Sequence, residues 1–181
     1  MKKYLALLLA LVMSLSLFAC GKKEGDDNKD KDKTEYKVAM ITDYGDITDQ
    51  SFNQTTYEAC KAFAEKNNIE FKYYKPAGDN TADRVAMIES AVEEGFNVIV
   101  MPGYAFGGAI VEAAPQHKDV KFIALDVAKG DLLEAGVAKA GEKYDYTPDN
   151  WELEKYVDMS NVYCAIYKEE LCGYMAGYAG V

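Results

Sequence analysis

The sequence predicts an α/β protein built on a doubly wound parallel sheet, and three features point to that class. Short apolar runs of about five residues recur along the chain without polar alternation, which is typical of strands buried on both faces. A longer segment with apolar residues at helical spacing follows nearly every run. Alternating units of this kind, joined by right-handed crossovers, give a parallel sheet covered by helices on both faces.

The first two units begin after residue 35. Lys37–Thr42 (KVAMIT) is a continuous apolar run and predicts the first strand, and Ser51–Lys66 has the apolar spacing of a helix. Ile69–Tyr74 predicts the second strand. The segment Thr81–Glu94 predicts the second helix, because its apolar residues lie three and four apart and Gly95 suits a C-cap.

The next unit follows the same pattern. Asn97–Met101 (NVIVM) predicts the third strand, Gly107–Ala114 a helix closed by Pro115, and Lys121–Leu125 (KFIAL) the fourth strand.

The C-terminal part is less regular. Residues 127–161 break the pattern, and a connection of that length suggests local helix, for instance around Asp149–Tyr156. Val162–Tyr167 predicts the fifth strand and Lys168–Ala179 a helix. Gly173 and Gly177 give that helix a small face that suits close packing, and the two Glu residues that open it disfavour a membrane dimer motif.

The N-terminus has the order of a secretory signal. Lys2 and Lys3 are followed by the apolar run Leu5–Phe18, which is shorter than the ~20 residues of a spanning helix. Leu17-Phe18-Ala19-Cys20 resembles a bacterial lipobox, in which the cysteine thiol is diacylated with fatty acids such as palmitate and becomes the mature N-terminus. We expect residues 1–20 to be a lipoprotein signal with Cys20 lipidated; an ordinary buried cysteine is the alternative.

Residues 21–35 predict a disordered tether, because they contain five Lys and six acidic residues but no Val, Ile, Leu or aromatic residue. The folded domain is expected at 36–181. Removal of two Lys with the signal changes the formal charge from −10 to −12. The sequence therefore predicts an acidic protein that is lipid-anchored on the extracytoplasmic face of the cell membrane.

Composition excludes several function classes. A net charge of −10 argues against nucleic acid as a partner. His117 is the single histidine and falls before a strand, away from the expected ligand edge, so a hydrolytic triad has no base. Cys60, Cys164 and Cys172 lack zinc spacing and are interpreted as small buried residues, with a Cys164–Cys172 disulfide left open.

Two further motifs fail on spacing. Asp43, Asp46 and Asp49 resemble calcium ligands, but the twelfth position of such a loop is Gln54 rather than Glu. The Gly-containing turns have neither dinucleotide nor phosphate-loop spacing. No metal or cofactor is expected, and the chain is not expected to be an enzyme.

Ligands of open parallel sheets bind beyond the carboxyl ends of the strands. Asp126 follows a strand and can accept hydrogen bonds from a ribose diol, or cap the segment after it. Phe52 offers a flat face for a base, with a core position as the alternative. Asn53 can read a purine edge or cap its helix, Asp49 suits a cap at least as well as a site role, and Tyr104 is a looser candidate for lining the pocket.

Residues 42–54 (TDYGDITDQSFNQ) resemble the signature of the basic membrane lipoprotein family of ABC-transporter substrate-binding proteins, which includes purine nucleoside receptors. Pro102-Gly103, Phe122–Asp126 and the Glu169–Gly177 segment match further blocks, so the resemblance covers about Val38 to Val181. Tyr57 and Ala59 stand where the family often has Trp and Gly, and the stretch Ala128–Asn161 is longer than expected.

The resemblance implies the N-terminal lobe of a type I periplasmic-binding fold, the second lobe lying outside this sequence. It also implies ligand-site positions at Asp43 and Asp126, and a nucleoside as the ligand, delivered to an ABC permease and its ATPase. Two alternatives stay open: a sensor lipoprotein that acts on a signalling partner, and a receptor for another small solute such as a sugar.

Overall fold

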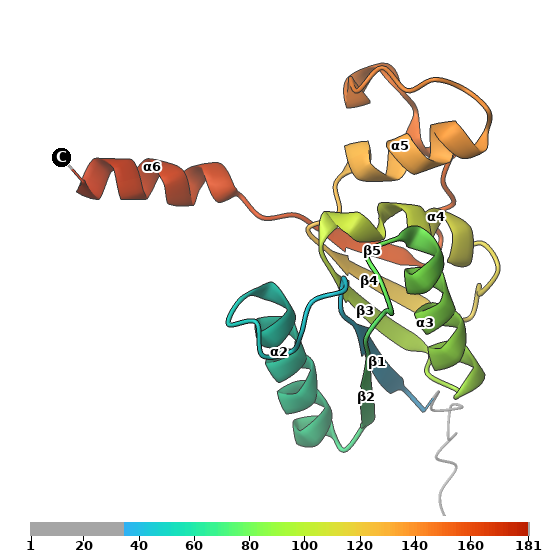
Figure 1. Ribbon diagram of the computed structural model, residues 1–181, viewed down its shortest axis with the longest axis vertical. Helices are drawn as coiled ribbons and strands as arrows, with labels where there is room; N and C mark the ends of the chain where they lie inside the picture. The colour runs from blue at the N-terminus through green and yellow to red at the C-terminus, as the bar shows by residue number, and fades with distance from the viewer. Residues whose placement is uncertain (1–34, 181) are drawn as a thin grey trace, which may run out of the picture. The chain divides into compact units, whose positions relative to one another are not determined.

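The computed structural model describes residues 35–180, which form one sheet of five parallel strands with helices on both faces (Figure 1). The strands are β1 (Lys37–Ile41), β2 (Glu70–Tyr74), β3 (Val98–Pro102), β4 (Lys121–Leu125) and β5 (Val162–Ala165). The predicted α/β class is confirmed, and every strand begins and ends within two residues of its expected bounds. The predicted signal, Cys20 and nearly all of the predicted tether lie outside the described residues.

The order of the strands is β2-β1-β3-β4-β5, so the chain reverses direction across the sheet after β2. Because crossovers between parallel strands are right-handed, this reversal moves the helices from one face to the other. Helix α2 (Phe52–Asn67) lies on one face, and α3 (Thr81–Glu93) and α4 (Gly107–Ala113) lie on the other (Figure 1). The reversal makes the β1/β3 junction the topological switch point of the sheet.

The core fills the face that carries α3 and α4. Alternate strand residues point to it and pack against apolar residues of the helices, among them Ala39, Ile41, Ile99, Met101, Phe122, Ile88, Ile110 and Leu132. The opposite face is covered only in part by α2. A hollow of about 270 Å³ remains between that helix and the sheet, lined by Val38, Ala59, Cys60, Phe63, Val98, Val100 and Ile123.

The prediction for residues 127–161 was wrong about where the helix lies. Helix α5 spans Lys129–Lys139, whereas the expected helix near Asp149–Tyr156 consists of two 3₁₀ turns, η2 (Pro148–Asn150) and η3 (Leu153–Lys155). The buried residues of α5 are Leu132, Leu133, Gly136 and Val137, which repeat at helical spacing. This spacing is present in the sequence, but the pattern is weak because the segment has only three large apolar residues and contains two glycines.

Helix α6 (Glu169–Ala179) forms as predicted but does not pack as predicted. None of its described residues is buried, and a Cβ added at Gly173 or Gly177 would meet nothing within 4 Å. Figure 1 shows it leaving the sheet on the segment that follows β5. Within residues 35–180, no helix has both the length and the apolarity to cross a membrane.

The cysteines are not joined in the described structure. Cys60, Cys164 and Cys172 are all free, so the disulfide left open between Cys164 and Cys172 is not formed. Cys60 and Cys164 are half-buried, and burial raises the pKa of the Cys60 thiol to about 11. Cys172 is exposed, contrary to the expectation of a buried residue, because α6 packs on nothing described here.

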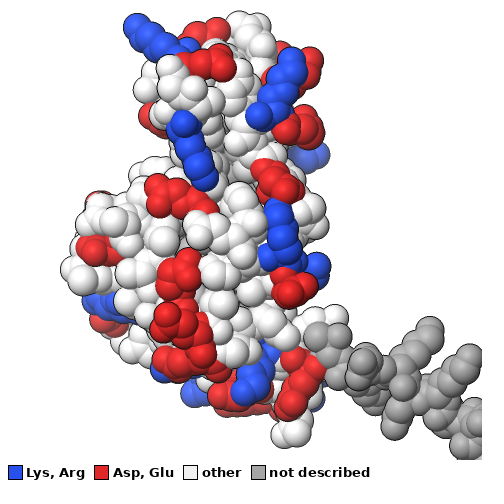
Figure 2. All heavy atoms as spheres, turned by 90° about the vertical axis from the view of Figure 1, so that its right-hand side faces the viewer, with Lys and Arg blue, Asp and Glu red and all other residues white. Residues whose placement is uncertain are grey.

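Charged side chains of both signs cover the surface that carries α3. Figure 2 shows Lys and Arg interspersed with Asp and Glu on this face, without a continuous basic stripe over the described residues.

Candidate functional site

The candidate site lies at the carboxyl edge of the sheet, where the residues that follow the parallel strands come together. Asp43 follows β1, Tyr104 follows β3, and Asp126 follows β4. Gly103 lies against Asp43, since a Cβ added there would be 4.0 Å from the Asp43 Cβ. This contact joins the ends of β1 and β3, the switch point at which open α/β sheets bind ligands.

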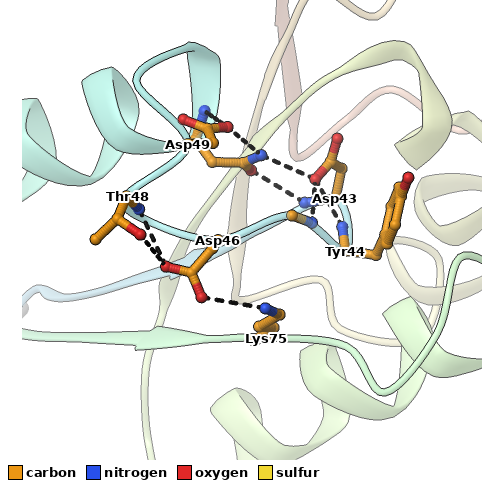
Figure 3. Close-up of polar contacts among 8 residues, drawn as sticks. Asp43, Tyr44, Asp46, Thr48, Asp49 and Lys75 are labelled. Atoms are coloured by element: carbon orange, nitrogen blue, oxygen red, sulfur yellow. Dashed lines mark hydrogen bonds and ion pairs between the residues drawn. The ribbon is translucent and has the colours of Figure 1, made fainter.

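The loop between β1 and α2 is ordered around the Asp43 carboxylate (Figure 3). Asp43 Oδ1 accepts hydrogen bonds from the main-chain N–H groups of Tyr44 and Gly45, both at 2.7 Å, and from Asn53 Nδ2 at 2.9 Å. Gly45 is required by close packing, because a Cβ there would lie 2.6 Å from Asn53 Nδ2. The carboxylate is thus held in one orientation before any ligand arrives.

Asn53 is buried, and its amide is fully used within this loop. Besides its bond to Asp43, Nδ2 donates to Asp49 Oδ2 at 3.0 Å, and Oδ1 accepts from the Asp43 main-chain N–H at 3.2 Å. Both amide hydrogens and the carbonyl oxygen are engaged. In this state the side chain organises the loop, so contact with a purine edge would require it to exchange a partner.

Asp49 caps α2, the alternative considered for it. Its carboxylate accepts from the main-chain N–H groups of Ser51, Asn53 and Gln54. These are unpaired donors at a helix N-terminus, which a carboxylate stabilises. Asp46 joins the same loop to the end of β2, accepting from Thr48 Oγ1 at 2.7 Å and pairing with Lys75 Nζ at 3.2 Å (Figure 3). The three aspartates therefore order a loop, and no metal-binding cluster of His, Cys, Asp or Glu occurs within residues 35–180.

The environment of Asp43 favours its charged form. Partial burial by itself raises the pKa of this carboxyl, but the hydrogen bonds from Gly45, Tyr44 and Asn53 outweigh it, and the Arg84 guanidinium adds to their effect. The net result is a pKa below the ordinary aspartate value of 3.8. At neutral pH the loop presents a fixed carboxylate with one oxygen, Oδ2, free of these bonds.

Phe52 is half-buried at the first turn of α2 and packs against an aromatic residue that sequence reasoning did not select. Its ring lies 6.0 Å from that of Tyr167, at an interplanar angle of 78°. Tyr167 follows β5, at the far side of the sheet from β1 in strand order. The only signal in the sequence was its position at a strand end. The pair brings aromatic surface to the same edge as Asp43.

Asp126 has a backbone conformation that most residues avoid. Its φ is +60°, and its main-chain N–H donates to the Ala165 carbonyl at 2.7 Å. Aspartate tolerates this left-handed region better than most non-glycine residues, and such conformations cluster at ligand sites. Within residues 35–180, no group hydrogen-bonds the Asp126 carboxylate, which leaves it available to a ligand.

Tyr104 is 70% exposed and borders a hollow of about 380 Å³ that Asp131 and Glu134 also line. Burial raises the pKa of Asp131, whose carboxylate accepts from the Ala128 N–H at 2.7 Å and so caps α5. The structure joins Asp43 to Asn53 directly. Tyr104 and Asp126 share only the edge of the sheet with that pair.

His117 lies outside this site, as expected. It precedes β4, and its Nε2 lies 2.9 Å from the Glu89 carboxylate. The residue that the sequence interpretation missed is Arg84 of α3, which is buried and hydrogen-bonds the Asp43 main-chain carbonyl. Its signal was a cation four residues before Ile88, on the apolar stripe of a predicted helix.

Comparison with protein families gives one model, that of the PnrA-like ABC transporter substrate-binding proteins (Bmp), which matches residues 36–180. The chain is 34% identical over 132 residues to the "CD4+ T-cell-stimulating antigen" of Listeria innocua, covering 67% of this chain and 36% of that protein. It is 25% identical over 122 residues to the "ABC transporter nucleoside-binding protein BmpA" of Lactococcus lactis, covering 65% and 34%. The chain spans about a third of the length of these relatives.

Several solved structures resemble the chain. A putative lipoprotein fragment from Peptoclostridium difficile has a TM-score of 0.48 at 19% identity, covering 80% of this chain and 96% of that one. An ABC transporter solute-binding protein from Aeropyrum pernix has a TM-score of 0.47 at 22% identity, covering 51% and 25%.

Proposed function

Because the chain belongs to the Bmp family of PnrA-like ABC transporter substrate-binding proteins, we propose that it captures purine nucleosides outside the cell and delivers them to an ABC permease and its ATPase. The family consists of solute-binding proteins, so the chain is not an enzyme. The Lactococcus lactis relative carries the name nucleoside-binding protein, which supports this ligand class.

The observation that carries the proposal is the combination of a flat aromatic ring at the start of α2 and a fixed carboxylate after β1. Phe52 presents ring surface beside Tyr167, while Asp43 is held by three hydrogen bonds at the switch point. Stacking on an aromatic side chain contributes about 1–3 kcal/mol per base in nucleic-acid binders. A purine presents both a π-face and polar edges, which suits such a pair.

In the proposal, Asp126 binds the sugar of the nucleoside. A carboxylate at a strand end can accept from both hydroxyls of a ribose, as an acidic residue does in dinucleotide folds. The unpaired Asp126 carboxylate and its left-handed backbone support this role. We assign Tyr104 to the rim of the site, and Asn53 to the same site through its bonds to Asp43 and Asp49.

The ligand is enclosed by two lobes in our proposal, of which residues 36–181 form the N-terminal one. The chain's coverage of about a third of its relatives' length supports a second lobe that supplies the remaining contacts. We further propose that Cys20 carries the lipid anchor and that residues 21–35 hold the domain away from the membrane. A relative from Pyrococcus furiosus is named an uncharacterized lipoprotein, which fits this arrangement.

Calorimetry of the intact protein with inosine, guanosine, free purine bases and ribose tests the ligand class. We expect the nucleosides to bind and ribose alone to bind weakly. Binding of ribose without any nucleoside would make the protein a sugar receptor, and formation of a product from inosine would make it an enzyme. Loss of nucleoside uptake on deletion of the neighbouring permease gene separates a transporter from a sensor.

A further inference from the structure

Arg84 is a buried charge that the proposed recognition leaves without a role. It lies in the first turn of α3, and only 4% of the residue is exposed. Arginine is almost never buried to this degree unless it is paired. A buried cation is weak evidence for stability, since apolar residues of similar size often replace such groups without loss. A contribution to stability therefore does not by itself explain why an arginine is buried here, and we consider the groups that Arg84 contacts.

These contacts reach the loops that follow three strands. Arg84 Nε donates to the main-chain carbonyl of Asp43, after β1, at 3.0 Å. Its Nη2 pairs with the carboxylate of Asp79, after β2. Its guanidinium carbon lies 5.7 Å from the centre of the Phe106 ring, after β3. One side chain thus links the segments that follow β1, β2 and β3.

The hydrogen bond from Arg84 to the Asp43 carbonyl also orients the N–H group of the same peptide. The peptide between Asp43 and Tyr44 is planar and trans, so its carbonyl and its N–H point in opposite directions as one rigid unit. Arg84 holds the carbonyl end, and the N–H end donates to Asp43 Oδ1 at 2.7 Å. Holding the carbonyl consequently orients the donor that fixes the carboxylate.

We propose that Arg84 is a positioning residue of the solute site, which fixes the Asp43–Tyr44 peptide and so keeps the Asp43 carboxylate in one orientation for the ligand. This inference rests on the proposed function for the identity of the ligand, but its effect on Asp43 does not require one.

The other charged groups around Asp43 are accounted for. Asp49 reaches it only through the Asn53 amide, Asp46 is paired with Lys75, and Asp79 is paired with Arg84. The charge of Arg84 helps to lower the pKa of Asp43, after the hydrogen bonds from Gly45, Tyr44 and Asn53. Removing its charge should therefore raise that pKa, whereas a lysine would keep a charge but lose the planar fork that serves two partners at once.

The first experiment needs no ligand. The carboxyl carbon of Asp43 is followed by NMR against pH in the intact protein and in the Arg84→Met and Arg84→Lys variants, with Asp43→Asn used for assignment. We expect the midpoint to move to higher pH in Arg84→Met and to stay closer to the wild-type value in Arg84→Lys. An unchanged midpoint in folded Arg84→Met would overturn the proposal.

The second experiment measures inosine affinity from neutral to acid pH. Arg84→Met should bind about ten- to a hundredfold more weakly and lose binding at a higher pH than wild type, whereas Arg84→Lys should lose affinity with little change in the acid midpoint. Ile88→Val, one turn further along α3 in the core, is the control for lost stability and should change neither quantity.

The outcomes separate the two proposals. If Ile88→Val reduces affinity as much as Arg84→Met, Arg84 acts through stability alone and the proposal fails. If the wild-type protein binds no nucleoside, the proposed function fails, and the NMR titration still decides whether Arg84 positions Asp43.

Discussion

Phe52 and Tyr167 pack edge to face, with ring centres 6.0 Å apart, although they are separated by four strands of the chain. Phe52 begins α2, which partly covers one face of the sheet, and Tyr167 follows the edge strand β5. The contact places the Tyr167 ring against the Phe52 ring and leaves Phe52 half-buried. A ring held in this way is suited to stacking on a base, because little side-chain freedom remains to be lost on binding.

Phe52→Ala should weaken binding of every nucleoside and free base by about 1–3 kcal/mol, because the stacking surface is lost whatever the sugar. Calorimetry with inosine and with hypoxanthine measures both. Tyr167→Leu should give a smaller loss of about 0.5–1.5 kcal/mol by removing the edge contact, and Tyr167→Phe should keep wild-type affinity. Equal affinity of wild type and Phe52→Ala would remove Phe52 from the site.

Asp126→Ala should discriminate between ligands instead. Its carboxylate is proposed to hold the ribose diol, and a hydrogen bond to a charged group contributes about 1.5–3 kcal/mol. Ribosides should lose that amount, whereas free bases and 2′-deoxy analogues should lose far less. Asp119→Ala changes an exposed carboxylate just before β4, at the opposite edge, and should have no effect on any ligand. The same loss for ribosides and free bases would place Asp126 away from the sugar.

Gly45→Ala should reduce both stability and affinity. The added methyl group would lie 2.6 Å from Asn53 Nδ2 and 3.1 Å from Asp43 Oδ1, so the loop must shift. Overpacking of this kind costs about 1–3 kcal/mol, measured by urea unfolding. Gly173→Ala is the matched substitution in α6, where nothing lies within 4 Å, and should be neutral or stabilise by up to about 1 kcal/mol. Equal unfolding midpoints for the two variants would contradict the packing argument.

Acid should destabilise the loop between β1 and α2. Asp43 and Asp49 have pKa values below the ordinary 3.8: burial raises each, but hydrogen bonds from the Gly45 N–H to Asp43 and from the Gln54 N–H to Asp49, with others, outweigh it. A carboxyl whose pKa is lower in the folded state stabilises the protein above its unfolded pKa, and the contribution is lost as pH falls through the folded value. Asp43→Asn should therefore flatten the fall in the free energy of unfolding below about pH 4. If the free energy of unfolding still falls steeply below about pH 4 in Asp43→Asn, groups other than Asp43 cause the acid destabilisation.

Cys20→Ala should abolish membrane attachment. The motivation is the signal segment, the small residue before Cys20 and the charged tether, all in sequence order. Detergent-phase partitioning of cell extracts is the measurement, and the variant should be released into the aqueous phase or remain unprocessed. Cys60→Ala, within α2, is the control and should partition as the wild type does.

Most strands and helices could be predicted from the sequence because buried apolar positions recur at short intervals along the chain. A strand buried on both faces is apolar at each position, and a helix packed on a sheet is apolar every three or four residues. Lys121–Leu125 was predicted to the residue. The C-cap of α3 is Glu94 rather than the expected Gly95, which follows it with a φ of +86°. Helix α5 was missed because its Ala- and Gly-rich sequence carries a weak version of the same pattern.

The site was readable only in outline. Parallel strands place their carboxyl ends at one edge, so the sequence by itself placed Asp43, Tyr104 and Asp126 there and determined the α/β class. It could not show that the Asn53 amide is consumed by Asp43 and Asp49, or that Phe52 meets Tyr167, because these contacts depend on how loops distant in sequence approach one another.

Arg84 and α6 are two features that the tertiary structure decided. On sequence alone, a cation on an apolar helical stripe is an exception, and only the packing of three strand-end loops around it decided that the charge is buried and paired. For α6, local propensity determined that Glu169–Ala179 is helical, but a helix forms from bonds within its own segment, whereas its docking requires a complementary surface. Tertiary structure alone decided that this sheet does not provide one within the described residues.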